Sequence, residues 1–493
     1  AGTCLGLTAA GRQDDIVVFD IGRKLGGMSA VLEGRKPLWD RPVYRSLHKG
    51  IRAAGQGWVP AKSFMGDTAR SYSSHPIYRS DMYGGLSKLW GASFLPFTAE
   101  DLADWPISGP ELAPYYDKLL SRIRVTGADD ALSGYFGGTA YNERALDRPE
   151  VFRRLEQAIN ARSGETSFIA GNPRLAVANS GPDGCTYCGH CFYGCYNRSI
   201  YSADMTIGAL EAEGKLRYVP GKRMLRFKRL ASGRVEIDWE EPESAGSKRG
   251  TDVFDRIYVA AGCIESTRIV SASLGVATFP IRENPMYQVP IVYTGGVRAE
   301  DFGRHIALIN VLAGRLPGAG IERYAHIQIY PINVYLWNHA LSKAFGSTGL
   351  RLSGLAQRTA GKHVYMMLFY LHGDYSKDSS LTFGDGGERL SFVYRDGTQE
   401  QMRLLVDGFA QALKGTGFHV LRHFVEPLAP GGSYHYGGTM PMGRSGLIRD
   451  SGCSVTDGIY VTDSAVFPSI PAQNHSFTIM ANAYRVAERS LAL

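Results

Sequence analysis

The side chains best suited to acid–base chemistry lie between residues 432 and 481. His435 stands in a glycine-rich run, Gly-Ser-Tyr-His-Tyr-Gly-Gly-Thr-Met-Pro-Met-Gly, at residues 432–443. A histidine has a pKa near neutrality, so it can take a proton from an alcohol held within about 3 Å. Asn474 follows in a later polar segment, and its amide can hold a developing alkoxide without competing for the proton. His435 and Asn474 together have the chemistry that proton removal from an alcohol requires.

Alcohol oxidation also needs a hydride acceptor, and no side chain is one, so the chain must bind a cofactor. A glycine-containing helix start at Gly2 leads to an apolar strand at residues 15–20, which ends in Asp20. This order is typical of the second half of a dinucleotide-binding βαβ unit, in which the carboxylate accepts hydrogen bonds from a ribose. The helix predicted between Thr3 and Gln13 is about two turns shorter than is usual in such a unit.

A second concentration of reactive side chains is a cysteine run. Four of the seven cysteines follow C-x2-C-x2-C-x3-C spacing, at Cys185, Cys188, Cys191 and Cys195. This spacing is typical of iron–sulfur ligation, although Tyr196 stands where ferredoxins usually have proline. Structural zinc and free or paired thiols are the alternatives. We predict an iron–sulfur cluster that carries single electrons away from the cofactor.

Three C-terminal segments, residues 432–443, 457–468 and 471–481, resemble the closing part of the glucose–methanol–choline (GMC) oxidoreductases. In that family an H-x-x-G-T-x-x-M loop, a strand ending in V-x-D-x-S-x-F-P and an N-P-x-x-T-I-M-A helix start come in this order. This chain departs in two places. Serine and alanine are exchanged at residues 464 and 465, and His475 replaces the family's proline.

The resemblance implies roles for individual residues. The loop histidine, here His435, takes the alcohol proton beside the flavin, and Asn474 is its partner, with His475 as the competing candidate. The cofactor implied is FAD, bound non-covalently, since residues 84–91 contain no histidine or cysteine at the positions that some members use for a covalent bond. The residues expected to contact FAD are Gly2, Asp20, Gly84, Gly85, Ser87, Ala261, Gly262 and Asp463.

Hydrophobic periodicity and the resemblance together predict an α/β fold, with a Rossmann-like FAD-binding domain and a second substrate domain built on an antiparallel sheet. Residues 290–375 alternate apolar and aromatic with polar side chains, which predicts an antiparallel sheet with one face toward the substrate. A helix packed on this sheet is predicted at residues 402–414. Short strands are predicted at residues 215–219, 224–228, 234–239 and 256–262.

The predicted domains are discontinuous in sequence. The FAD-binding domain is expected at residues 1–96, 197–285 and 430–493, the substrate domain at 97–184 and 286–429, and a Cys-rich loop at 185–196.

The bulk composition argues against several protein classes. The formal net charge of +7 is modest for 493 residues and the basic residues are scattered, so no nucleic-acid partner is expected. No apolar run approaches the roughly 18 residues of a membrane span, and no signal peptide opens the chain. An odd number of mostly clustered cysteines does not suit a secreted disulfide framework. A cytoplasmic protein without an integral membrane segment is expected.

Taken together, the motifs predict an FAD-dependent alcohol dehydrogenase. Its substrate is expected to be a small sugar-like or polyol alcohol, and its electrons would pass to an acceptor or redox partner, through the cysteine site if this holds a cluster. Three alternatives stay open: a GMC oxidase that uses oxygen, a lyase with structural FAD, and a non-enzymatic electron-transfer module.

Overall fold

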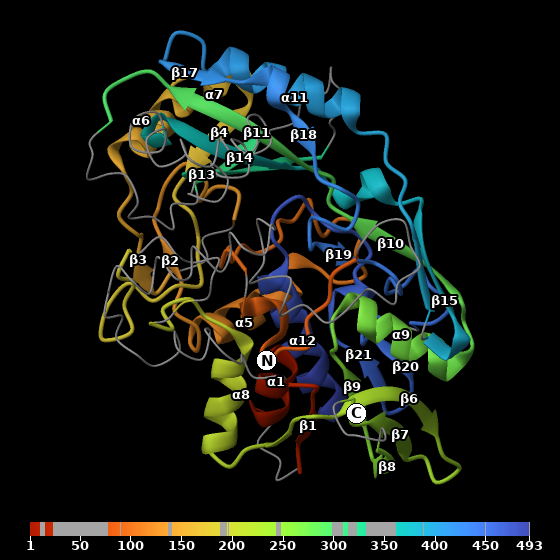
Figure 1. The fold of residues 1–493 in the computed structure, drawn as a ribbon. Coiled ribbons are helices and arrows are strands. Elements are labelled where there is room, and N and C mark those ends of the chain that lie inside the picture. Colours follow the sequence, from red (N-terminus) through yellow and green to blue (C-terminus); the bar gives the residue numbers. More distant parts are fainter. Residues whose placement is uncertain are drawn as a thin grey trace, which may run out of the picture.

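The computed structural model shows a mixed α/β fold (Figure 1). Among the residues that it describes, no helix is long and apolar enough to cross a bilayer. The described residues are 1–9, 15–22, 77–88, 90–136, 141–187, 195, 197–242, 248–297, 309–313, 323–331, 361–387, 389–448 and 450–492.

Two parallel strand pairs bring the two ends of the chain into one core. The pairs are β1 (Val17–Phe19) with β5 (Arg217–Val219), and β9 (Ile257–Val259) with β21 (Ile459–Val461); β20 (Ser454–Thr456) is antiparallel to β21. The strand predicted at residues 15–20 is confirmed as β1. Valines, isoleucines and aromatic residues dominate these short strands. Strand β21 is buried along its whole length, whereas β1 and β5 are only partly buried.

Helix α1 (Gly2–Ala9) packs along the long C-terminal helix α12 (Ser476–Ala492), as Figure 1 shows. A Cβ added at Gly2 would collide with the backbone of Met480, and one at Gly6 would lie 2.6 Å from the carbonyl oxygen of Tyr484. Only glycine permits this separation, so the two glycines set how closely the helices approach. The helix predicted after residue 3 is therefore present, and its residues 10–13 lie outside the described part.

An antiparallel meander and a helix follow β5 in the chain. The meander consists of β6 (Arg223–Arg229), β7 (Val235–Glu240) and β8 (Arg249–Phe254), and the helix is α9 (Cys263–Leu274). The strands predicted at residues 215–219, 224–228, 234–239 and 256–262 are confirmed as β5, β6, β7 and β9. In β7 every second side chain is buried, because one face of the meander lies on the core.

The largest sheet has seven antiparallel strands. Its order is β17 (Phe418–Val420), β11 (Met286–Tyr293), β14 (Val364–Tyr370), β13 (Ala325–Pro331), β12 (Ile309–Ala313) and β4 (Phe168–Gly171), with β18 (Glu426–Pro427) also on β11. The antiparallel sheet predicted for residues 290–375 is thus confirmed for the described strands β11, β12, β13 and β14, while residues 298–308, 314–322 and 332–360 lie outside the described part. Helix α6 (Glu150–Asn160) and helix α11 (Gln399–Ala412) share a hydrophobic core with it, so the helix predicted at residues 402–414 is confirmed.

The central strands of this sheet separate apolar from polar side chains. On β13, Ala325, Ile327 and Ile329 face the helix-covered core, while the residues between them point to the other face. On β14, Tyr365, Met367 and Phe369 enter the same core. Because side chains alternate along each strand, one face of this sheet packs on the helices, and the other face carries His326, Gln328, Tyr330 and Tyr370.

A four-stranded sheet connects the middle of the chain to its C-terminal part. Its order is β16 (Arg389–Val393), β15 (Ser379–Gly384), β10 (Thr278–Glu283) and β19 (Tyr436–Gly437). The remaining described α-helices and strands are β2 (Thr126–Gly127), β3 (Glu143–Arg144), α5 (Gly109–Leu120), α7 (Ser163–Thr166) and α8 (Ala203–Ala212).

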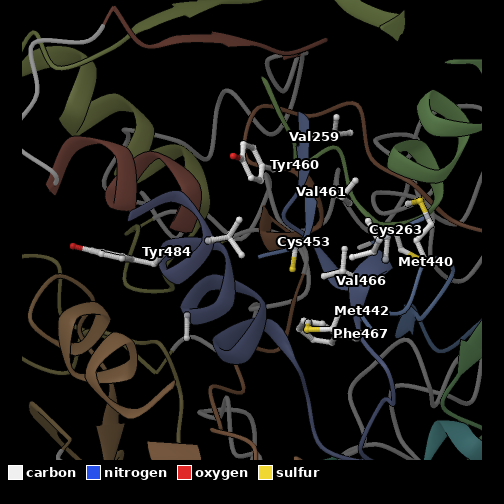
Figure 2. Close-up of a cluster of buried hydrophobic side chains, with 14 of the residues drawn as sticks. Val259, Cys263, Met440, Met442, Cys453, Tyr460, Val461, Val466, Phe467 and Tyr484 are labelled. Atoms are coloured by element: carbon white, nitrogen blue, oxygen red, sulfur yellow. The ribbon is translucent and has the colours of Figure 1, made fainter. Parts of the chain in front are cut away.

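The largest hydrophobic core is built mostly from the predicted FAD-binding segments, and Figure 2 shows part of it around Val259, Val461 and Phe467. Helix α5 and strands β15 and β16, which the sequence analysis assigns to the substrate segments, also contribute to this core. The second core lies within the predicted substrate segments, between the seven-stranded sheet and its helices. The domain boundaries themselves stay a prediction.

Candidate active site

His435 lies immediately before β19, at the point where the four-stranded and seven-stranded sheets meet. Strand β10 pairs with β19, and the chain then continues from β10 through Asn284 into β11. The backbone N–H of Asn284 donates to the carbonyl of His435 at 3.3 Å. His435 is therefore held against the end of β10 by two attachments: the pairing of β19 with β10 and the hydrogen bond from Asn284.

Both ring nitrogens of His435 have amide partners. Its Nδ1 lies 3.2 Å from Oδ1 of Asn284, and its Nε2 lies 3.0 Å from Nδ2 of Asn474. The two residues singled out from the sequence, His435 and Asn474, are thus within hydrogen-bond distance of each other.

The chain of side-chain contacts continues from Asn474 onto the polar face of β13. Gln328 donates its Nε2 to Oδ1 of Asn474 at 2.5 Å, and the Tyr330 hydroxyl donates to Oε1 of Gln328 at 2.5 Å. We call the five residues Tyr330, Gln328, Asn474, His435 and Asn284 the amide–histidine chain. It joins segments that are far apart in sequence, and its order in space could not be derived from periodicity.

Two aromatic rings pack against His435. Tyr370 of β14 stacks on His435 with ring centroids 5.2 Å apart, and His475 meets the same ring edge-on at 4.8 Å. His326 lies beyond Tyr370, with ring centroids 6.2 Å apart. The Nδ1 of His475 is buried and has no hydrogen-bond partner among the described residues. His475 is therefore a ring neighbour of His435, whereas Asn474 is the hydrogen-bond partner of His435.

Burial keeps the histidines of this site uncharged. It lowers the pKa of His435 to about 4. It also lowers the pKa of His326 to about 3 and that of His475 well below its usual range, with His435 adding to both effects. A neutral imidazole at pH 7 retains a lone pair, so His435 can accept a proton at neutral pH without first losing one.

A buried carboxylate holds the loop that leads to His435. Glu283 accepts hydrogen bonds from the backbone N–H of Gly431 at 2.7 Å, from that of Ser433 at 3.0 Å, and from the Ser433 hydroxyl at 2.8 Å. The Ser433 hydroxyl in turn accepts from the N–H of His435 at 3.1 Å. Burial raises the pKa of Glu283 to about 7, although these hydrogen bonds act in the opposite direction.

One group of predicted FAD contacts lies near the first parallel strand pair. The carboxylate of Asp20 accepts a hydrogen bond from the Tyr218 hydroxyl at 2.9 Å, and burial raises the pKa of Asp20 to about 6. Gly84 and Gly85 have φ of +99° and +60°, which glycine adopts without strain. Ser87 fixes this turn, because its hydroxyl donates to the Gly84 carbonyl at 2.5 Å and accepts from the backbone N–H of residue 203 at 2.9 Å.

A second group of predicted contacts surrounds the start of α9. Asp463 accepts from the N–H of Gly262 at 2.9 Å and from the Ser266 hydroxyl at 2.5 Å, and its other oxygen accepts from the N–H of Ala465 at 3.0 Å. The Ser266 hydroxyl also accepts from the N–H of Ala261 at 3.0 Å. Both oxygens of the Asp463 side chain therefore bind the protein itself, tying α9 to β21.

These residues fit a flavin dinucleotide. The Thr3 hydroxyl at the start of α1 lies 2.9 Å from that of Thr462, so the helix begins beside the end of β21. A helix N-terminus of this kind favours a phosphate. A Cβ added at Gly85 or Gly262 would meet nothing within 4 Å, which leaves open space over both glycine backbones. The Asp20 carboxylate provides an acceptor suited to a ribose.

Gly2 is a predicted FAD contact, but a Cβ added at this glycine would face the backbone of Met480 in α12. Close helix packing alone accounts for this glycine. A contact of Gly2 with FAD stays a prediction.

The cysteine run is described only in part. Cys185 and Cys195 pack against a small hydrophobic cluster formed by Ala92, Leu146, Leu175, Val177 and Ile200. The backbone N–H of Tyr187 donates to Sγ of Cys185 at 3.4 Å. Cys188 and Cys191 lie outside the described residues. Among the residues that are described, no group of three or more histidine, cysteine or acidic side chains could hold a metal ion. The predicted iron–sulfur cluster gains no support from the structure.

Four contributors to the site were missed in the sequence. The alternation of β13 placed Gln328 and Tyr330 on one face of a strand, but not beside Asn474. Asn284 and Glu283 follow each other at the end of β10, and no spacing rule connects them to a histidine some 150 residues later. The only signal in the sequence was that two polar residues, Glu283 and Asn284, stand together between two largely apolar segments.

The fold of this chain is similar to those of solved flavin-dependent and oxidase structures. The chain resembles pyridoxine 4-oxidase from Mesorbium loti, with a TM-score of 0.60 and 14% identity over 100% of this chain and 97% of the other. It also resembles an FAD-dependent oxidoreductase from Chaetomium thermophilum, with a TM-score of 0.60 and 12% identity over 99% and 96% of the two chains. No curated protein sequence gives a significant match.

The sequence itself supplies a more specific comparison. Residues 406–483, which include His435, Asp463 and Asn474, match the family described as GMC oxidoreductase. The fold shared with the two solved structures extends over the rest of the chain. The C-terminal segment of this enzyme, residues 406–483, is thus similar to the GMC oxidoreductases, and the fold of the chain is similar to those of the two solved structures.

Proposed function

We propose that this enzyme is an FAD-dependent alcohol dehydrogenase in which His435 removes the hydroxyl proton of a small, sugar-like or polyol alcohol. FAD, held by a Rossmann-like domain, supplies the hydride acceptor when bound. The observation that carries the proposal is the contact of a neutral His435 with Asn474 in a polar, aromatic-lined site. The partners proposed with it are the alcohol and an electron acceptor.

The residues of this chain would act in a simple order. The hydroxyl proton of the alcohol moves to Nε2 of His435, which burial keeps unprotonated at neutral pH. The Asn474 amide, 3.0 Å from that nitrogen, donates to the oxygen as negative charge develops on it. Tyr370 restrains the imidazole by stacking on it, and the exclusion of water by the surrounding rings strengthens both hydrogen bonds.

The central test replaces the base. In His435→Ala, FAD should stay bound while its reduction by the alcohol slows by about 10²–10⁴-fold, the usual contribution of a positioned base. Asn474→Ala should slow it by about 100-fold, corresponding to one lost oxyanion donor. Stopped-flow bleaching of the flavin measures both rates. His419→Ala, on an exposed β17 residue, is the control and should match the wild type. Normal flavin reduction in His435→Ala would refute the proposal.

The electron acceptor defines a second candidate. The structural neighbour from Mesorbium loti is named an oxidase. The second candidate function for this chain is therefore an oxidase that passes its electrons to oxygen. The wild-type enzyme, reduced by substrate and mixed with air-saturated buffer, separates the two. Fast reoxidation with one peroxide per flavin supports the oxidase, and slow reoxidation that artificial carriers accelerate supports the dehydrogenase.

The iron–sulfur cluster stays a separate part of the proposal, based on the cysteine spacing alone. Anaerobically purified protein should contain iron and acid-labile sulfide in addition to FAD. Cys185→Ser should lose the iron and slow reoxidation by carriers, while flavin reduction stays unchanged. Zinc without iron, or no metal at all, would end this part of the proposal and leave the assignment of His435 intact.

A further inference from the structure

Asn284 is the most constrained member of the amide–histidine chain. It is fully buried, and its Nδ2 donates to the carbonyl oxygens of Leu371 at 2.9 Å and Pro471 at 3.0 Å, with that of Ile470 at 3.5 Å. A carbonyl oxygen can only accept, so the donor end of the amide must face these groups. The end that faces His435 must therefore be Oδ1.

This fixed amide determines which ring nitrogen of His435 carries the proton. Oδ1 of Asn284 is an acceptor 3.2 Å from Nδ1, so the neutral imidazole is stable there only with its hydrogen on Nδ1. A neutral imidazole has one N–H. The lone pair is then on Nε2, the nitrogen that faces Asn474 and the site.

The tautomer of His435 also fixes the direction of hydrogen-bond donation through the rest of the amide–histidine chain. With a lone pair on Nε2, Asn474 presents its donor Nδ2 to the ring and its Oδ1 to Gln328. Gln328 then donates from Nε2 and presents Oε1 to the Tyr330 hydroxyl. The reverse direction would place an unprotonated Nδ1 against Oδ1 of Asn284, two acceptors with no hydrogen between them. Every hydrogen bond in the chain is satisfied in one direction only.

We propose that Asn284 is a positioning residue that holds His435 in the Nδ1–H tautomer and so makes Nε2 the proton acceptor of the reaction. This inference rests on the proposed function for its catalytic meaning, but the tautomer can be observed without turnover. The residue touches neither the alcohol nor the flavin in this account. It acts through the ring of His435.

Nitrogen-15 NMR of the FAD-loaded enzyme, labelled at histidine, tests the inference directly. The His435 signals are identified by their loss in His435→Gln. The wild type should show a protonated Nδ1 and an unprotonated Nε2 at pH 7. A protonated Nε2 in the wild type would overturn the inference, whatever the activity of the enzyme.

Two variants extend the test to the role of Asn284. In Asn284→Leu the acceptor is lost, so the signals should shift toward a mixture of tautomers and flavin reduction should slow by about tenfold, corresponding to one hydrogen bond. In Asn284→Asp an acceptor remains, so the Nδ1–H tautomer should persist. Its negative charge raises the pKa of His435, and the acid limb of the reduction rate should therefore move to higher pH. An unchanged tautomer in Asn284→Leu would contradict the inference.

A matched control separates tautomer effects from general loss of an amide. Asn160 also bridges backbone groups, donating to the Ala170 carbonyl and accepting from the Ala170 N–H, both at 2.9 Å, and it is not a member of the amide–histidine chain. Asn160→Leu should leave the His435 signals unchanged. The two proposals can fail separately. If His435→Gln reduces flavin at the normal rate while the wild type shows the Nδ1–H tautomer, the proposed function is refuted but the role of Asn284 in fixing the tautomer is not.

Discussion

Two buried glutamates, Glu265 and Glu283, show how the same side chain behaves in opposite ways in two regions of this enzyme. Glu265 lies at the start of α9 among three arginines: Arg268 at 2.6 Å, Arg79 at 2.7 Å and Arg223 at 3.2 Å. Burial opposes its ionisation, but the arginines outweigh burial and lower its pKa to about 2. Glu283 has only backbone and serine donors among the described residues, and burial raises its pKa to about 7.

The difference shows what each region requires. Near α9 a permanent charge network fixes the meander and the helix, since Arg268 also donates to the carbonyls of residues 224 and 225. Below His435, no cation from the described part of the chain stabilises the Glu283 carboxylate, so the carboxyl group binds its loop through neutral dipoles. A cation beside Glu283 would also disfavour protonation of His435, because the two positive charges would repel each other.

The largest expected effect follows from removing the charge at Glu265. Glu265→Gln leaves three arginines without their common partner, and breaking a buried ion pair of this kind costs about 3–5 kcal/mol in the free energy of unfolding. Urea denaturation at pH 7 measures this loss. A cost below about 1 kcal/mol would show that solvent already satisfies these arginines and that the contrast with Glu283 is smaller than described.

The pH dependence of stability should have opposite signs for the two glutamates. The pKa of Glu283 rises from 4.5 to about 7 on folding, so its stabilising contribution is complete below pH 4.5 and is lost as pH rises through 7. The loss is about 3 kcal/mol at pH 8. Glu265, with a folded pKa of about 2, contributes fully above pH 4.5 and loses its contribution as pH falls toward 2.

Glu283→Gln isolates one of these two slopes. An amide does not titrate, so the variant should be less sensitive to pH than the wild type between pH 5 and 8, as measured by Tm at each pH. Flavin reduction at pH 6 should stay within severalfold of the wild type if the introduced amide still holds the loop. An unchanged wild-type slope in the variant would assign the pH dependence to other groups.

The smallest expected effect comes from an exposed glutamate that serves as a baseline. Glu400 contacts Arg403 at 2.7 Å on the exposed face of α11, and both side chains are more than half exposed. Solvent screens such pairs, so Glu400→Gln should not change Tm measurably at any pH. A pH-dependent change there would show that surface charge, and not burial, dominates the two buried cases.

The sequence predicted those parts of the molecule that depend on local pattern. Alternation of apolar and polar side chains within residues 290–375 predicted the antiparallel sheet, and helical periodicity at residues 402–414 predicted α11. The motif around His435 and Asn474 predicted two residues that the structure brings within 3.0 Å of each other.

The rest depends on contacts between distant segments. Asn284 and Gln328 reach the site through sheet register, which a single sequence does not encode locally. The charge state of Glu283 depends on the absence of a nearby cation among the described residues, and no sequence motif reports an absence. The choice between Asn474 and His475 needed their distances to one ring, because both are adjacent in sequence and both lie next to His435.

The amide–histidine chain also has a consequence for how the enzyme folds. Its members come from residues 284, 328, 330, 435 and 474, so the histidine is oriented only after segments separated by up to 190 residues have met. Long-range contacts of this kind form slowly, because loop closure must precede them. A refolding chain should therefore recover strand and helix content before the His435 tautomer is fixed, and catalytic competence should return only with the slowest folding phase.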